Sequence, residues 1–110
     1  RNLSISMNFN NHPIPLSQDE IMSLAETFRL LGDASRLKIL LFCMRGPSSV
    51  GEISDALDLS QSLVSHNLRL LRSARLVKGE RQSKQVFYEI DDLHVSQVLL
   101  DMASHISEEH

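Results

Sequence analysis

Four side chains of the types that bind metal ions lie close together in the C-terminal part of the chain. They are Asp92, His94, His105 and Glu108. Neutral imidazoles and carboxylates are ordinary zinc ligands, and a structural zinc site holds four of them in a tetrahedron. A single His, Asp or Glu is usually just a solvated surface residue. The hypothesis of a metal site therefore depends on the four residues together.

The spacing of the two histidines indicates how such a site would be built. His94 and His105 are eleven residues apart, about three turns of an α-helix, so both would project from one face. They would lie roughly 16 Å apart along the axis, whereas a zinc–nitrogen bond is about 2.0–2.1 Å long. One ion cannot bind both. An antiparallel second copy of the helix would bring Asp92 and His94 of one chain to His105 and Glu108 of the other. The spacing predicts two metal sites between the subunits of a symmetric dimer.

The overall composition is that of a small soluble protein. A chain of 110 residues, 42% of them hydrophobic, is expected to form one domain with a modest core that would gain from dimerisation. No apolar run approaches the roughly 18 residues of a membrane-spanning helix, and no signal peptide is recognisable. The single cysteine excludes an intramolecular disulfide. We expect a cytoplasmic protein.

Charge is distributed unevenly along the chain. The formal net charge of −3 argues against indiscriminate binding to nucleic acid. Six basic residues and one acid nevertheless lie between Arg69 and Lys84, whereas the segment from Glu89 to His110 has six acids and no Lys or Arg. A basic segment next to an acidic one predicts separate surfaces for a polyanion and for a cation.

The first 16 residues are polar and Asn-rich and contain Pro13 and Pro15. They are interpreted as a flexible N-terminal arm. Residues 1–6 precede the first methionine, Met7, and are either left over from expression or part of a longer chain. Residues 17–110 are predicted to form one domain that ends in a helix for dimerisation and metal binding.

Side chains that can cap a helix mark the predicted helix starts. Ser17 with Glu20 and Ser49 with Glu52 have the spacing of capping boxes. The predicted helices run from Ser17 to Leu31, from Asp33 to a stop at Gly46-Pro47, from Val50 to Leu57, from Ser60 to Ser73, and from Asp91 or Asp92 onward. Two apolar faces are expected to point inward: Leu63, Val64, Leu68 and Leu71 in the fourth helix, and Val95, Val98, Leu99, Met102 and Ile106 in the last.

Two short runs between the last two helices have the character of strands. Residues 76–81 and 85–90 are joined by the polar link 81–84, so a two-stranded hairpin is predicted. A short helix, a three-residue turn, a longer helix and a basic hairpin together describe a winged helix-turn-helix. The predicted fold is therefore mainly α with a two-stranded β-hairpin, in a homodimer.

In a helix-turn-helix the second helix enters the major groove of double-stranded DNA with its N-terminal residues at the bases. The residues expected there are Gln61, Ser62, Ser65 and His66. Contacts to the DNA backbone, or from the wing to the minor groove, are expected from Arg69, Arg72, Lys78, Arg81 and Lys84. The alternative for the basic residues is a solvated face, and for His66 it is a local structural hydrogen bond.

Four segments together resemble the ArsR/SmtB family of metal-responsive repressors. They are residues 31–37 (LGDASRL), 63–68 (LVSHNL), 81–88 (RQSKQVFY) and the ligand string D-x-H-x10-H-x2-E that begins at Asp92. The resemblance covers roughly residues 24–108, and the string is similar to that of the SmtB/CzrA-like zinc and cobalt sensors. It implies a homodimer that binds operator DNA without metal and releases it when zinc, or cobalt, binds.

The resemblance also implies roles for individual residues. Asp92, His94, His105 and Glu108 match the family's ligands, with Glu108 as in the SmtB-like version, and His110 is a nearby spare donor. The metal-free nitrogen of His105 would link to the backbone around His66. An arm histidine, here His12, could complete a six-coordinate nickel or cobalt site, and nickel is the less favoured metal.

A second, thiolate site of the family is missing from this chain. Where the thiolate sensors often read Cys-Val-Cys-Asp, this chain reads Ser49-Val50-Gly51-Glu52. Cys43 lies on the apolar second helix and is interpreted as a small buried hydrophobic residue. Sensing of arsenic, cadmium or lead through thiolates is therefore not expected.

Two other classes of function remain open. A metal-independent regulator with the same fold would leave the four polar residues without a metal. An enzyme with a zinc site would keep one coordination position open for water, which four protein ligands do not. Because the chain also has no recognisable nucleophile–base or phosphate-loop motif, no catalytic residue is predicted.

Overall fold

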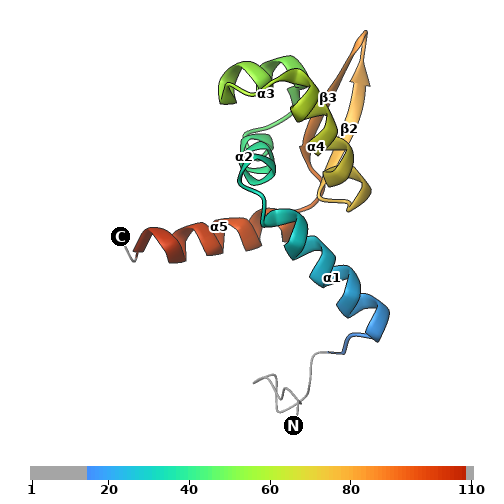
Figure 1. Ribbon diagram of the computed structural model, residues 1–110, viewed down its shortest axis with the longest axis vertical. Coiled ribbons are helices and arrows are strands. Elements are labelled where there is room, and N and C mark those ends of the chain that lie inside the picture. Colours follow the sequence, from blue (N-terminus) through green and yellow to red (C-terminus); the bar gives the residue numbers. More distant parts are fainter. Residues whose placement is uncertain (1–14, 109–110) are drawn as a thin grey trace.

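The computed structural model describes residues 15–108 and shows five helices and three strands in that range. Three helices and the sheet form a body from which the first and last helices extend (Figure 1). The elements in chain order are α1 (Gln18–Leu31), α2 (Ala34–Cys43), β1 (Ser48–Ser49), α3 (Val50–Leu57), α4 (Gln61–Ser73), β2 (Val77–Gln82), β3 (Gln85–Ile90) and α5 (Leu93–Glu108). This is the predicted winged helix-turn-helix. The predicted arm lies almost wholly outside the described residues.

The predicted helix starts are confirmed by the hydrogen bonds that cap them. Both capping boxes are present: Ser17 Oγ accepts from the Glu20 backbone N–H at 3.1 Å, and Ser49 Oγ accepts from that of Glu52 at 3.2 Å. Asp92 opens the last helix, because its Oδ1 accepts from the backbone N–H of Val95 at 3.1 Å. These caps satisfy N–H groups that have no partner inside the helix.

The core lies where α2, α3, α4 and the base of the hairpin meet. Its most deeply buried apolar side chains are Ile39, Leu40, Ile53, Val64, Leu68, Leu71 and Val77. The inward face predicted for α4 is correct for Val64, Leu68 and Leu71 and wrong for Leu63, which is 36% exposed. Leu63 lies about 100° around the helix from Val64, beyond the stripe that faces the core.

The sheet has one more strand than predicted. β2 and β3 form the predicted hairpin, shifted by one residue at β2, and the short strand β1 pairs antiparallel with the other edge of β3. Ser48 lies opposite Tyr88, and both serines of β1 are buried. β1 therefore attaches the base of the wing to the start of α3, the first helix of the helix-turn-helix.

Gly79 on β2 allows two side chains of the neighbouring strand to cross it. A Cβ at this position would lie 2.9 Å from Cε1 of Tyr88 and 3.0 Å from Cγ1 of Val86, closer than carbon atoms can pack without movement. Gly51, in the first turn of α3, is different, because its nearest neighbour would be Ser49 Oγ at 4.0 Å.

The two glycines predict opposite changes in stability. Gly79→Ala should lower the free energy of unfolding by about 1–3 kcal/mol, since the added methyl group overpacks the wing. Gly51→Ala should raise it by about 0.4–1 kcal/mol, because alanine restricts the unfolded chain and fits the helix. Urea unfolding followed by circular dichroism measures both. Equal effects of the two substitutions would contradict the packing described for the wing.

α1 and α5 leave much of their apolar surface uncovered. On α1 the exposed large hydrophobic side chains are Ile21, Met22, Leu24 and Phe28, and on α5 they are Leu93, Val98, Leu100, Met102 and Ile106. Of the inward stripe predicted for α5, only Leu99 is buried within the chain. No helix among residues 15–108 is both long and apolar enough to cross a membrane. The exposed apolar faces of α1 and α5 are not covered by any other element within the described part of the chain.

Candidate metal and nucleic-acid sites

The residues predicted to read DNA share one face of α4. Gln61, Ser62, His66, Arg69 and Arg72 are exposed and Ser65 is half-buried. At about 100° per residue they span an arc of about 140°, and the buried Val64, Leu68 and Leu71 lie outside this arc. Because Ser60 Oγ caps the Leu63 N–H at 3.1 Å, the helix begins where Gln61 and Ser62 are the first residues to project. The structure exposes most of these side chains, and their contact with DNA stays a prediction.

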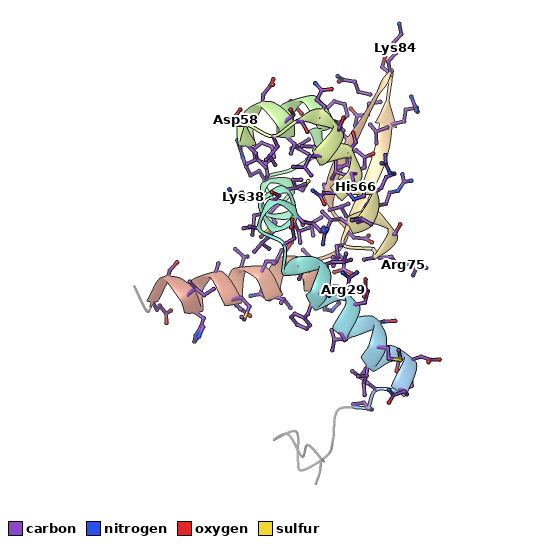
Figure 2. All side chains as sticks on the ribbon, viewed as in Figure 1. Arg29, Lys38, Asp58, His66, Arg75 and Lys84 are labelled. Carbon is purple, nitrogen blue, oxygen red and sulfur yellow. The ribbon has the colours of Figure 1, made fainter. Side chains whose placement is uncertain are left out.

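The basic residues of the wing are exposed as well. Lys78 and Arg81 lie on β2, and Lys84 occupies the tip of the hairpin (Figure 2). The tip turns at Ser83, whose φ of 62° lies in the left-handed region. Figure 2 labels His66 on α4, the helix that contacts strand β2 of the hairpin.

Asp92 and His94 lie together at the start of α5. His94 Nδ1 is 3.8 Å from Asp92 Oδ1, and the two side chains are 98% and 55% exposed. Asp92 Oδ1 already accepts from the Val95 N–H. The pair thus offers an imidazole and a carboxylate side by side, on a helix start whose position is fixed by the same carboxylate.

His105 and Glu108 lie at the other end of the same helix and are exposed. Three residues apart, they are neighbours on a helix surface. Among residues 15–108 of a single chain, no three His, Cys, Asp or Glu side chains gather closely enough to bind a metal ion. The chain thus carries Asp92 and His94 at one end of α5 and His105 and Glu108 at the other, and their role as metal ligands stays a prediction. His12 and His110 lie outside the described residues.

An apolar pocket of about 180 Å³ separates α1 from the first half of α5. Its walls include Leu24, Phe28, Val95 and Val98, and His94 stands at its edge. His94 is thus next to apolar side chains of both α1 and α5.

Cys43 is buried, as predicted, and the start of α3 carries a capping box. Cys43 is 1% exposed, and burial raises the pKa of its thiol to about 12, so it is protonated and unreactive at neutral pH. Ser49 and Gly51 occupy the positions of the missing thiolates, and Ser49 forms the capping box of α3 with Glu52. Both observations give these residues structural roles.

One polar connection was not anticipated from the sequence. Arg36 at the start of α2 donates from Nε to Oδ1 of Asn67 at 3.0 Å and from a terminal nitrogen to the carbonyl oxygen of Leu30 at 2.9 Å. Asn67 is 2% exposed, and its Nδ2 has no acceptor among the described residues. Arg36 and Asn67 are 31 residues apart, so no local pattern could have paired them.

Comparison with known proteins gives a family. The model for bacterial regulatory proteins of the arsR family matches residues 33–78, which cover α2 to the start of β2. The chain is 38% identical over 96 residues to a protein of Synechocystis named a transcriptional repressor SmtB homolog, covering 87% of this chain and 73% of that one. It is 39% identical over 99 residues to the transcriptional regulator NmtR of Mycobacterium tuberculosis, covering 90% and 82%.

A solved structure has the same fold. The homodimeric winged helix-turn-helix DNA-binding domain of a Mycobacterium bovis protein superposes with a TM-score of 0.74 at 25% identity, over 88% of this chain and 92% of that one. The superposed part is longer than residues 33–78, which the family model matches.

Proposed function

This chain belongs to the ArsR family of bacterial regulatory proteins. We propose that it is a homodimeric repressor that binds operator DNA without metal and dissociates from it when zinc or cobalt binds. Its named relatives are regulators of transcription, and an enzymatic function is set aside. The released gene would encode metal efflux or sequestration, since that response removes the signal. A DNA-binding regulator of this kind works in the cytoplasm.

One observation carries the proposal: α5 presents two separated, exposed half-sets of metal ligands. The donor set of two imidazoles and two carboxylates is complete for a tetrahedral zinc site, and it can be assembled only from two chains. Asp92 and His94 of one protomer would bind together with His105 and Glu108 of the other, twice per dimer. When bound, the metal would link the two α5 helices and stabilise one arrangement of the subunits.

The exposed apolar faces of α1 and α5 support the dimer. Large apolar patches rimmed by polar residues are typical of protein–protein contacts, and here the patch adjoins both half-sets. The relative from Mycobacterium bovis is described as homodimeric. A two-fold dimer would carry two copies of α4 and two wings, which is the arrangement that reads a pseudo-palindromic operator.

The test is a comparison of operator binding with and without metal. Fluorescence anisotropy with a labelled operator fragment should show tight binding by the apo protein and a loss of affinity with zinc or cobalt, of about 5–150-fold for a coupling of 1–3 kcal/mol. Nickel should have a smaller effect. If the operator is bound but no metal binds or changes the affinity, the protein is a metal-independent regulator and the metal half of the proposal is wrong.

The wing and the recognition helix predict distinguishable changes in DNA binding. Arg81→Ala and Lys84→Ala should weaken binding to all DNA and reduce the salt dependence by about one unit of log–log slope for each phosphate that the variant no longer neutralises. Gln61→Ala should instead reduce the preference for operator over random DNA, because amide groups read base edges.

Lys38→Ala is the matched control, since Lys38 is also exposed but lies on α2 away from the wing (Figure 2). Salt titrations of the binding constant measure all four variants. Similar effects of Gln61→Ala and Lys84→Ala on operator and random DNA would show that α4 is not the reading helix.

A further inference from the structure

Arg36 connects three helices of the protomer through one side chain. Its guanidinium donates to Asn67 in the middle of α4 and to the carbonyl oxygen of Leu30 in the last turn of α1, while Arg36 itself belongs to the first turn of α2. A cation is favourable at a helix C-terminus, where unpaired carbonyl groups concentrate negative charge. The side chain thus holds the end of α1 at a fixed place beside α4.

Asn67 occupies its position in spite of an unfavourable feature. The side chain is almost fully buried, and only its oxygen is used by Arg36, whereas Nδ2 is left without an acceptor within residues 15–108. A buried donor without a partner is destabilising, and an apolar side chain of similar size would avoid this cost. Asn67 is therefore not explained by a contribution to stability. Its side chain accepts the hydrogen bond from Arg36, and this bond is the candidate for its role.

The two helices joined in this way face different partners. α1 exposes Ile21, Leu24 and Phe28 on the side proposed for dimer contact, and α4 carries Gln61 and His66 on the side proposed for DNA. We infer that the Arg36–Asn67 pair is a positioning element that fixes the recognition helix relative to the dimer helix α1. The inference rests on the proposed function. It adds that the angle of α4 relative to α1 depends on this pair. The fit of the two recognition helices of the dimer to the two operator half-sites would therefore depend on it as well.

Replacing both partners by apolar side chains separates positioning from stability. Arg36→Met combined with Asn67→Leu removes the bond, the partly buried cation and the unpaired donor together, so the melting temperature should be unchanged or higher. The ratio of operator to random-DNA affinity should nevertheless fall about 2- to 30-fold, the range found for substitutions within coupling networks. A purely structural pair would not lower the ratio in a protein of undiminished stability.

Two further variants isolate the cause. Asn67→Asp keeps an acceptor for Arg36 and removes the unpaired donor, so it should preserve the ratio, while Asn67→Leu alone should lower it. Arg29→Met is the control for loss of an arginine, because Arg29 is exposed on α1 and forms its ion pair with Glu26 on the same helix. An equal fall of the ratio of operator to random-DNA affinity in Asn67→Asp and Asn67→Leu would overturn the inference. If the double variant does not fold, this comparison decides the matter.

A distance measurement tests the inference without DNA or metal. Spin labels on Ser23→Cys in α1 and Ser73→Cys in α4, both exposed positions, report the separation of the helices, and the buried Cys43 should remain unlabelled. Dilution with unlabelled chains restricts the signal to single protomers. The distance distribution should broaden in the double variant and in Asn67→Leu but not in Asn67→Asp or Arg29→Met.

An unchanged distribution in the double variant would overturn the inference even if the protein represses as proposed. Conversely, a parent protein without preference for any operator would refute the proposed function while the distances still decide the role of the pair.

Discussion

A dimer with His94→Ala in one protomer and His105→Ala in the other will bind one zinc ion tightly, whereas a dimer with both substitutions in the same protomer will bind none. The two dimers contain the same two substitutions. In the first, both fall in one intersubunit site and leave the other complete. In the second, each site loses one imidazole. The difference follows from the separation of about 16 Å between the histidines along one helix.

The experiment requires differently tagged protomers that are co-expressed and purified as mixed dimers. Zinc stoichiometry is then measured by competition with a chelating indicator, with the parent dimer expected to bind two ions. Each homodimeric single variant should bind none tightly. Because the two mixed dimers have the same composition, effects of the substitutions on folding or charge cancel. Tight zinc binding by a verified monomer, or equal stoichiometry in the two mixed dimers, would contradict intersubunit sites.

Ile21→Asp will weaken operator binding about 10²- to 10⁴-fold although the residue is remote from the DNA-reading face. Ile21 is an exposed apolar residue of α1, and in the proposed dimer it is covered by the partner. A carboxylate buried there without a counter-ion costs several kcal/mol, and each dimer contains two. Loss of the dimer separates the two half-site contacts, so the second one no longer benefits from a high effective concentration.

Ser23→Asp supplies the matched control, because it adds the same charge to the same exposed helix about 160° away around the axis. Sedimentation velocity gives the oligomeric state, and anisotropy gives the operator affinity. Ser23→Asp should remain dimeric and bind normally. An Ile21→Asp protein that is still dimeric and still binds the operator would show that α1 does not form the interface.

What the sequence predicted well is what neighbouring residues determine. The capping boxes at Ser17 and Ser49 fixed two helix starts, since each cap is completed within four residues. The polar face of α4 could be predicted because its polar residues recur at helical spacing beside the apolar stripe, and its role in reading DNA stays a prediction. The same logic gave the two half-sets of ligands on α5, whose metal-binding role stays a prediction.

What could not be predicted depends on contacts between distant segments. Periodicity identified an apolar face on α5, but it could not show that most of this face would remain uncovered within the chain. The two-residue strand β1 is too short for an alternating pattern. The bond between Arg36 and Asn67 joins side chains whose neighbours in sequence give no sign of each other. In each case the partner is set by the fold.

The pairing of β1 with β3 also bears on how the chain folds. Ser48 lies opposite Tyr88, so about 40 residues separate the partners, and closing such a loop costs about 3 kcal/mol of chain entropy before two residues add their bonds. The helices α3 and α4 and the β2–β3 hairpin form from local contacts and shorten this loop. β1 is thus expected to join the sheet after the transition state, so that substitutions at Ser48 accelerate unfolding more than they slow refolding in stopped-flow experiments. Ser49, as both strand residue and cap of α3, would belong to both stages of assembly.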